Sequence, residues 1–180
     1  MLKTNMFNTI IIDNFFDNYP MLEQEFKKVP IYAQKDFPEF IAEGVSWPGR
    51  RSKELALTHP FMWQLTNKEI LTKSENERLV RVPFKMALSM HLRLHEDQAL
   101  DYIHTDSTDL TMIVFLSKTN LNSGLSIYNI NKEETHHIKF VQNRAVIFDG
   151  KQNHKSSLNY GDNIDNGRIT LNGFINFLWD

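Results

Sequence analysis

The stretch VRVPFKMALSMHLRL, from Val80 to Leu94, carries the clearest structural pattern in the chain. Every even-numbered residue in it is apolar, and the residues between them are polar apart from Pro83 and Ala87. A period of two places alternate side chains on opposite faces of a β-strand. The stretch therefore predicts a long strand with one buried face. Pro83 indicates a sheet edge or the start of the strand, because proline cannot donate a ladder hydrogen bond.

More strand-like runs surround this stretch, and turn residues such as Asn122-Ser123-Gly124 and Asp149-Gly150 separate them. Short strands that follow one another in this way favour antiparallel pairing. Most of these runs follow two helices, and this order predicts a mainly β fold, a β-sandwich or, more specifically, a double-stranded β-helix (jelly roll) braced by N-terminal helices. The expected strands are Phe7–Ile12, Leu110–Leu116, Leu125–Ile130, His136–Val141, Ala145–Phe148 and Arg168–Trp179.

The first expected helix begins near Asn18, which is a favourable N-cap residue, and Pro20 suits its first turn. An apolar stripe then follows at Leu22, Phe26 and Val29. This pattern indicates a short helix that packs one face against the core.

The second expected helix follows His59, with Pro60 at its start and apolar residues at helical spacing behind it. These residues are Phe61, Met62 and Leu65. Farther on, the pairs Glu69/Lys73 and Glu77/Arg81 have the four-residue spacing of ion pairs on a helix. We expect both pairs to lie on a solvated surface.

Length and composition limit the possible classes of protein. With 180 residues, 41% hydrophobic and 23% charged, the chain suits one compact domain. We expect a single domain over residues 1–180, with a helical and mixed support region at 1–78 and the jelly-roll core at 79–180. The formal charge of −2 disfavours a protein that coats nucleic acid. The absence of Cys leaves any metal to His, carboxylate and water ligands.

Membrane insertion is not expected. The longest wholly apolar run near the N-terminus is Ile10–Ile12, whereas a membrane span needs roughly 20 residues. The sequence therefore predicts a soluble, cytoplasmic protein.

Seven histidines suggest a metal site, and their spacing excludes several pairs. His91 and His95 lie about 13 Å apart on a strand, too far to share one ion. His136 and His137 are adjacent and point to opposite faces of a strand, which favours structural or surface roles. His59 belongs to the start of a helix.

The most informative pair is His104-Thr105-Asp106. On an extended segment, residues two apart project to the same side with Cα atoms roughly 6–7 Å apart, so an imidazole and a carboxylate can bind one ion. A second such motif, His95-Glu96-Asp97, is kept as an alternative. His154, which follows Asp106 by 48 residues, supplies a candidate third ligand.

Arg168 and Thr170 open the last expected strand and share a face of it. A guanidinium beside a hydroxyl is a good receptor for a carboxylate. Two His, a carboxylate and a following Arg have the order of a non-haem ferrous site with an organic acid beside it. Asn172 shares their face and points either into this pocket or to solvent. Taken singly, Asp106 could instead be a turn residue and Arg168 a surface charge.

In these features the sequence resembles the Fe(II)/2-oxoglutarate-dependent oxygenases, specifically the prolyl-hydroxylase-like branch. The resemblance covers Met86 to Trp179, and Trp47–Ser52 is similar to a segment of uncharacterised, often phage-associated relatives. The segments that carry it are Leu92–Leu94, Tyr102–Asp106, Met112–Leu116, Gly124–Tyr128, Arg144–Asp149 with His154, and Gly167–Gly173. Ser123 stands where the family has one of its glycines.

The resemblance implies that a ferrous ion is held by His104, Asp106 and His154. It further implies that 2-oxoglutarate is bound by Arg168, with Thr170 and Tyr102 as additional contacts, although Tyr102 could equally anchor a loop. Dioxygen and an unknown substrate would complete the reaction, a hydroxylation of a protein side chain or small molecule coupled to decarboxylation of 2-oxoglutarate to succinate. Ascorbate would act as a supporting reductant.

Three other functions remain open. A cupin-type metal enzyme that does not use 2-oxoglutarate is one, although such an enzyme needs no clamp like Arg168. A non-catalytic cupin-like or β-sandwich binding module is another. Nucleobase demethylation, the third, is disfavoured by the net charge.

Substrate choice is expected to depend on the segments Trp47–Lys53 and Glu96–Ile103. There, Arg50, Arg51 and Lys53 either form a solvated loop, the favoured interpretation, or contact an anionic substrate.

Overall fold

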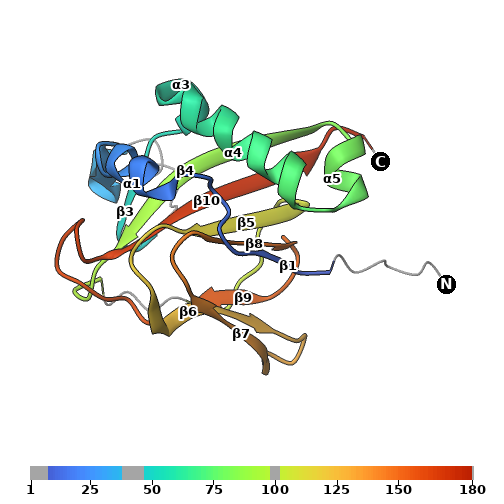
Figure 1. Cartoon of the computed structure of the whole chain (residues 1–180). Coiled ribbons are helices and arrows are strands. Elements are labelled where there is room, and N and C mark those ends of the chain that lie inside the picture. The colour runs from blue at the N-terminus through green and yellow to red at the C-terminus, as the bar shows by residue number, and fades with distance from the viewer. Residues whose placement is uncertain (1–7, 38–46, 98–101, 180) are drawn as a thin grey trace.

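The computed structural model describes residues 8–37, 47–97 and 102–179. Helices cover one face of a seven-stranded antiparallel sheet, and a three-stranded sheet lies against its other face (Figure 1). The mainly β, jelly-roll prediction is confirmed. The strands are β1 (Ile10–Ile12), β2 (Ile31–Ala33), β3 (Arg50–Ser52), β4 (Phe84–Arg93), β5 (Leu110–Phe115), β6 (Asn120–Tyr128), β7 (Glu134–Phe140), β8 (Arg144–Asp149), β9 (His154–Ser156) and β10 (Arg168–Phe177). The helices are α1 (Tyr19–Lys27), η1 (Gln34–Asp36), α3 (Leu55–Thr58), α4 (Pro60–Lys73) and α5 (Glu77–Arg81).

The large sheet has the order β1-β8-β5-β10-β4-β3-β2, and the small sheet has the order β7-β6-β9. β10 is central and pairs with β4 along its whole length, from Arg168 opposite Arg93 to Phe177 opposite Phe84. Because paired residues point to the same face, the two strands present one continuous row of side chains to the small sheet. That row forms one wall of the candidate site.

The predicted strand at 80–94 is correct from Phe84 onward and wrong at its start. Val80 and Arg81 belong to α5, which begins after Asn76. The Asn76 side chain accepts hydrogen bonds from the backbone N–H groups of Arg78 and Leu79, so it caps this short helix. Capping and the burial of Leu79 therefore override the alternating pattern locally.

Two apolar clusters hold the layers together. The larger lies between the helices and the large sheet, and the smaller lies between the two sheets. The even-numbered apolar side chains of β4 from Met86 to Leu92 all belong to the larger cluster. The opposite face of β4 is therefore left for polar residues, which line the space between the sheets.

The helix predictions hold in outline and fail in two details. Asn18 is the N-cap of α1, but its backbone is left-handed and its side chain makes no capping bond. Glu69 on α4 was expected at a solvated surface and is instead only 1% exposed, with Lys73 at 3.0 Å. Glu77 and Arg81 form the expected exposed pair at 3.6 Å.

Residues 1–78 contribute strands as well as helices. β1 pairs with β8 at one edge of the large sheet, and β3 pairs with β4 near the other. The interpretation of Arg50 and Arg51 as a solvated loop is therefore wrong, because both residues lie in β3. Three residues are too few to show a clear alternation in the sequence.

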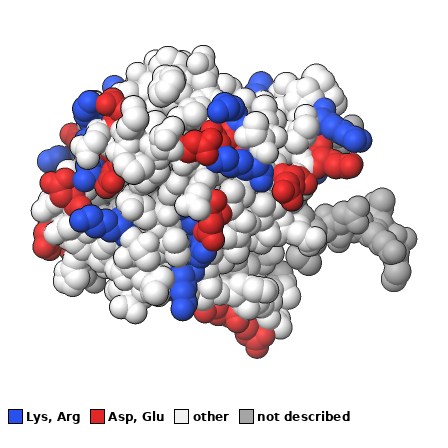
Figure 2. All heavy atoms as spheres, in the orientation of Figure 1, with Lys and Arg blue, Asp and Glu red and all other residues white. Residues whose placement is uncertain are grey.

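Basic and acidic side chains are interspersed on the face shown in Figure 2, consistent with the near-zero net charge. Within the described residues, no helix combines the length and apolar character that a membrane crossing requires.

Candidate metal centre

Two backbone hydrogen bonds bring His104 and His154 side by side. The N–H of His104 donates to the carbonyl of His154 at 3.1 Å, and the N–H of His154 donates to the carbonyl of His104 at 2.9 Å. The ring centroids are 4.4 Å apart. Two residues that are far apart in the sequence thus form one isolated β-bridge, with His154 at the first position of β9.

Both imidazoles are oriented by backbone carbonyls. Nδ1 of His104 lies 2.8 Å from the carbonyl oxygen of Tyr102, and Nδ1 of His154 lies 2.9 Å from that of Gln152. Because a carbonyl can only accept, Nδ1 of each ring carries a proton, and in the neutral imidazole Nε2 is the atom with the lone pair. The Nε2 atoms lie 4.0 and 3.5 Å from the Asp106 carboxylate, respectively.

Asp106 is held in place on both its backbone and its side chain. Its N–H donates to the carbonyl of Gly150 at 2.7 Å. The Thr111 hydroxyl on β5 donates to its carboxylate at 2.5 Å, and this contact was not anticipated from the sequence. Such supporting hydrogen bonds orient the ligands of metal sites and fix their geometry.

The ligand atoms of His104, Asp106 and His154 all lie within 4.8 Å of one another. This spacing suits three ligands on one face of a single ion. Among the described residues, no other group of three His, Cys, Asp or Glu side chains has such a geometry.

The alternative pair lies elsewhere. His95 is exposed, and the Asp97 carboxylate accepts a hydrogen bond from the N–H of Leu94, as a turn residue does. His136 and His137 are both exposed on β7, so neither is the buried member that their opposite orientations allowed. His59 precedes α4 as its N-cap residue, as predicted.

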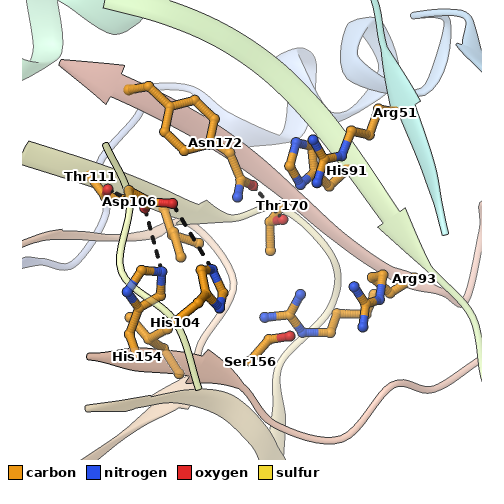
Figure 3. A pocket seen from close by; sticks show the side chains of 14 residues that line it. Arg51, His91, Arg93, His104, Asp106, Thr111, His154, Ser156, Thr170 and Asn172 are labelled. Atoms are coloured by element: carbon orange, nitrogen blue, oxygen red, sulfur yellow. Dashed lines mark hydrogen bonds and ion pairs between the residues drawn. The ribbon is translucent and has the colours of Figure 1, made fainter. Parts of the chain in front are cut away.

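The three candidate ligands line a cavity of about 120 Å³ between the sheets. In Figure 3, Asp106, His104 and His154 lie on one side, while Arg51, His91 and Arg93 lie on the opposite side. Thr170 and Asn172 lie between the two groups. The full lining comprises Arg51, His91, Arg93, His104, Asp106, Thr111, Ile113, Leu125, His154, Ser156, Arg168, Thr170, Asn172 and Phe174.

Arg168 is 3% exposed and lines this cavity. One of its guanidinium nitrogens donates to the carbonyl of Gly124 at 3.2 Å, and Cζ lies 5.5 Å from the centroid of the Phe140 ring. The Thr170 hydroxyl donates to the Asn172 side-chain oxygen at 2.7 Å. Arg168, Thr170 and Asn172 thus share the face of β10 that points into the cavity, and this face does not point to bulk solvent.

Tyr102 is placed differently. Its side chain is 67% exposed, and its ring lies 5.3 Å from that of His104, outside the residues that line the cavity. The geometry gives no support to a role for this residue in binding 2-oxoglutarate.

Sequence reasoning missed the far wall of the cavity, which is formed by Arg51, His91 and Arg93 opposite the three candidate ligands. The sequence predicts only a polar strand face for His91 and Arg93 on β4, and for Arg51 it favours a solvated loop over contact with an anionic substrate. The signal for the first two was available, because they occupy the odd-numbered face of the stretch that starts the sheet. Burial is the main cause that lowers the pKa of His91 well below its usual range, followed by the nearby guanidinium groups of Arg51, Arg93 and Arg168.

A second cavity of about 410 Å³ adjoins the first and shares Asp106 and Phe174 with it. Lys85, Ala87 and Asn176 also line it, at the exposed ends of β4 and β10. The inner face of the two strands therefore runs from the buried arginines to an open groove.

No protein-family model matches the sequence, and no curated protein matches it either. Solved structures do match the fold. An oxidoreductase of the 2OG-Fe(II) oxygenase family from Burkholderia pseudomallei superposes with a TM-score of 0.63 at 9% identity, over 93% of this chain and 84% of that one. The chain has the fold of the Fe(II)/2-oxoglutarate oxygenases.

Two further structures extend this likeness. The non-haem α-ketoglutarate-dependent epimerase SnoN from nogalamycin biosynthesis matches with a TM-score of 0.63 and 14% identity, over 93% of this chain and 76% of that one. A prolyl hydroxylase from Trichoplax adhaerens matches with a TM-score of 0.58 and 16% identity, over 97% and 84%. At these identities the oxygenase likeness, including that to a prolyl hydroxylase, concerns the fold alone. The predicted phage association gains no support.

Proposed function

We propose that this protein is an Fe(II)- and 2-oxoglutarate-dependent dioxygenase that hydroxylates a protein side chain or a small molecule. The observation that carries the proposal is the convergence of His104, Asp106 and His154 on one cavity that Arg168 also lines. A His-carboxylate-His set with free positions on one side suits ferrous iron. The oxygenase fold provides the context in which this set lies.

The donor set fits the ion. The Nδ1–H···O=C bonds leave the Nε2 atom of each neutral ring to act as a ligand, 4.0 Å (His104) and 3.5 Å (His154) from the Asp106 carboxylate. Mixed nitrogen and oxygen donors of this kind accept Fe(II) and other divalent transition metals, whereas Mg(II) prefers all-oxygen sites. We propose that His104, Asp106 and His154 are the metal ligands.

The cavity wall fits an organic dicarboxylate. Arg168 is buried and its planar guanidinium can receive a carboxylate through two parallel hydrogen bonds. The Thr170 hydroxyl, on the same face of β10, would donate a further hydrogen bond after leaving its present acceptor, Asn172. We propose that Arg168 and Thr170 bind the distal carboxylate of 2-oxoglutarate.

When bound, ferrous iron with 2-oxoglutarate and dioxygen supplies an oxidation that yields succinate and CO2 and inserts oxygen into a C–H bond. The protein's own residues would bind and orient the ion and the organic acid, and they would exclude water. His104, Asp106 and His154 fix the position of the ion, and Arg168 fixes the orientation of the organic acid. The apolar side chains of Ile113, Leu125 and Phe174 narrow the cavity around them.

The 2-oxoglutarate-independent metal enzyme and the non-catalytic binding module are the alternatives that the test must separate. The SnoN structure, described as an epimerase, shows that this fold also serves other outcomes than hydroxylation.

We also propose that residues 1–78 and 79–180 act as one oxygenase-like domain, because β1 and β3 extend the sheet built by the later strands.

The decisive experiment measures succinate formation from 2-oxoglutarate with ferrous iron and oxygen, with ascorbate as reductant, beside metal binding to the same protein. We expect stoichiometric metal binding and slow, uncoupled succinate formation even without substrate. His104→Ala and His154→Ala should abolish both, while His136→Ala, at an exposed position on β7, should change neither. Metal binding without 2-oxoglutarate turnover would favour the 2-oxoglutarate-independent enzyme, and neither activity would favour the binding module.

A further inference from the structure

The motif WPGRRS, from Trp47 to Ser52, has no role in the proposed chemistry, yet it builds part of the cavity. Its strand β3 pairs with β4, where Arg51 lies opposite His91. Alternation along β3 sends Arg51 to the cavity face, while the neighbouring Arg50 is directed toward Glu96, at 3.3 Å. One arginine of the motif therefore faces the cavity and the other does not.

Two residues of the motif position guanidinium groups at the far wall. The buried Trp47 ring lies beneath Arg51, with Cζ 4.6 Å from the ring centroid. Gly49 has a φ of +79°, and a Cβ there would lie 2.4 Å from the carbonyl oxygen of Leu92 and 2.7 Å from Cδ of Arg93. The absence of a side chain at Gly49 thus leaves room for the Arg93 side chain.

The groups that face the cavity are mainly cationic. Arg51, Arg93 and Arg168 line it, and Asp106 is the one carboxylate among its described lining residues. A divalent metal ion and a 2-oxoglutarate dianion together add no net charge to this wall. The proposed function uses Asp106 and Arg168, and it assigns nothing to Arg51 and Arg93.

The surroundings of His91 agree with this excess of cationic groups. His91 lies opposite both Arg51 and Thr170 in the sheet and is half-buried, and its Nε2 lies 3.1 Å from the Ser89 hydroxyl. Its pKa is lowered by burial first and then by the surrounding guanidinium groups, so the imidazole stays neutral beside them. The far wall is thus a positive surface with a neutral hydrogen-bonding ring in its centre.

We propose that Arg51 and Arg93 form a second anion subsite, which binds the carboxylate or phosphate group of a small anionic substrate. The proposal rests on the proposed function, because it places 2-oxoglutarate on Arg168. Planar guanidinium groups suit both kinds of anion. Figure 3 shows this subsite across the cavity from the three candidate ligands, so an anion held there would direct the rest of its molecule toward the metal.

The test uses protein saturated with Zn(II), as a redox-inert substitute for iron, and with 2-oxoglutarate, so that Arg168 is already engaged. Acetate and methyl phosphate are then titrated by calorimetry. We expect one further anion site, weakened at least tenfold by Arg51→Gln or Arg93→Gln. Arg50→Gln is the matched control on the same strand and should leave the affinity unchanged. A preference for acetate would identify a carboxylate substrate, and a preference for methyl phosphate a phosphate ester.

A second measurement separates this subsite from the 2-oxoglutarate site. In the Zn(II)-loaded protein, the affinity for 2-oxoglutarate should stay within twofold in Arg51→Gln and Arg93→Gln and should fall at least tenfold in Arg168→Gln. Retained 2-oxoglutarate binding also shows that the variants fold. An equal loss in all three variants, or anion binding that ignores Arg51 and Arg93, would overturn the proposal. Wild-type protein that fails to bind 2-oxoglutarate would overturn the proposed function, and the subsite with it.

Discussion

At the scale of single residues, the geometry of the candidate centre depends on groups other than the three candidate ligands. Two carbonyl oxygens fix the tautomers of His104 and His154, and the Thr111 hydroxyl fixes the Asp106 carboxylate. A ligand that is already oriented loses less conformational freedom on binding. We therefore expect these contacts to contribute to metal affinity as well as to geometry.

Thr111→Val should weaken metal binding without removing a ligand. The change keeps the side-chain shape and deletes the hydrogen bond to Asp106. Loss of such a supporting contact typically costs about 10–100-fold in metal affinity. A competition titration with a chelator measures this loss. Thr111→Ser should restore most of the affinity, and equal affinity in the valine variant would show that Thr111 does not position Asp106.

Arg168→Lys should raise the concentration of 2-oxoglutarate needed for half-maximal succinate formation and leave the metal affinity intact. Lysine keeps the charge but loses the planar pair of donors that matches a carboxylate. Steady-state kinetics against 2-oxoglutarate, beside a metal titration, distinguish the two effects. An unchanged half-saturation concentration would argue against Arg168 as the clamp.

At the scale of elements, the pairing of β4 with β10 sets which side chains can meet. Arg93 lies opposite Arg168, and His91 lies opposite Thr170. A shift of β4 by one residue would turn His91 and Arg93 toward the apolar cluster beneath the helices. The even-numbered apolar residues of β4 prevent such a shift, because it would expose them to the cavity.

Neutralising Asp13 should loosen the edge strand β1. Arg144, the first residue of β8, contacts the Asp13 carboxylate at 2.6 Å, and this hydrogen bond is the main cause that lowers the pKa of Asp13 below its ordinary value of 3.8. A lowered folded-state pKa adds stability above the ordinary value, and that stability disappears as the pH falls through the folded-state value.

A double-mutant cycle of Asp13→Asn and Arg144→Gln measures this contribution through unfolding in urea. Because the Asp13 side chain is 55% exposed, we expect a coupling free energy of about 0.2–1 kcal/mol at pH 7 that declines below pH ~4. A coupling that grows as the pH falls would contradict the assignment.

At the scale of the whole molecule, metal binding should stabilise the fold. His154 opens β9 in the small sheet, and the Asp106 carboxylate is hydrogen-bonded to Thr111 on β5 of the large sheet, so an ion held by His154 and Asp106 would connect the two sheets. A ligand that binds only the folded state stabilises it by about 2.7 kcal/mol at a hundred times its Kd.

Thermal unfolding followed with and without Fe(II) under anaerobic conditions checks this expectation. The Tm should rise with Fe(II), fall again with EDTA and respond little to Mg(II). His154→Ala should abolish the rise, and His137→Ala, at an exposed position on β7, should preserve it. A rise that survives His154→Ala would place the ion elsewhere.

The sequence by itself determined most of the strands, the two main helices and the pairs His104/Asp106 and Arg168/Thr170. Short-range spacing decides these features, because a period of two assigns neighbouring side chains to a face without knowledge of the partner strand. The same local patterns failed where a helix cap prevailed, as at Val80, and where a strand is only three residues long, as at Arg50–Ser52.

Only the tertiary structure decided which separate segments meet. The bridge between His104 and His154, the placement of Tyr102 outside the cavity and the addition of Arg51 to its far wall all depend on contacts between residues tens of positions apart. Spacing along the chain carries no information about such meetings, because sheet order and register are set by the packing of the whole core. The cavity is a product of that packing, and so is its positive wall.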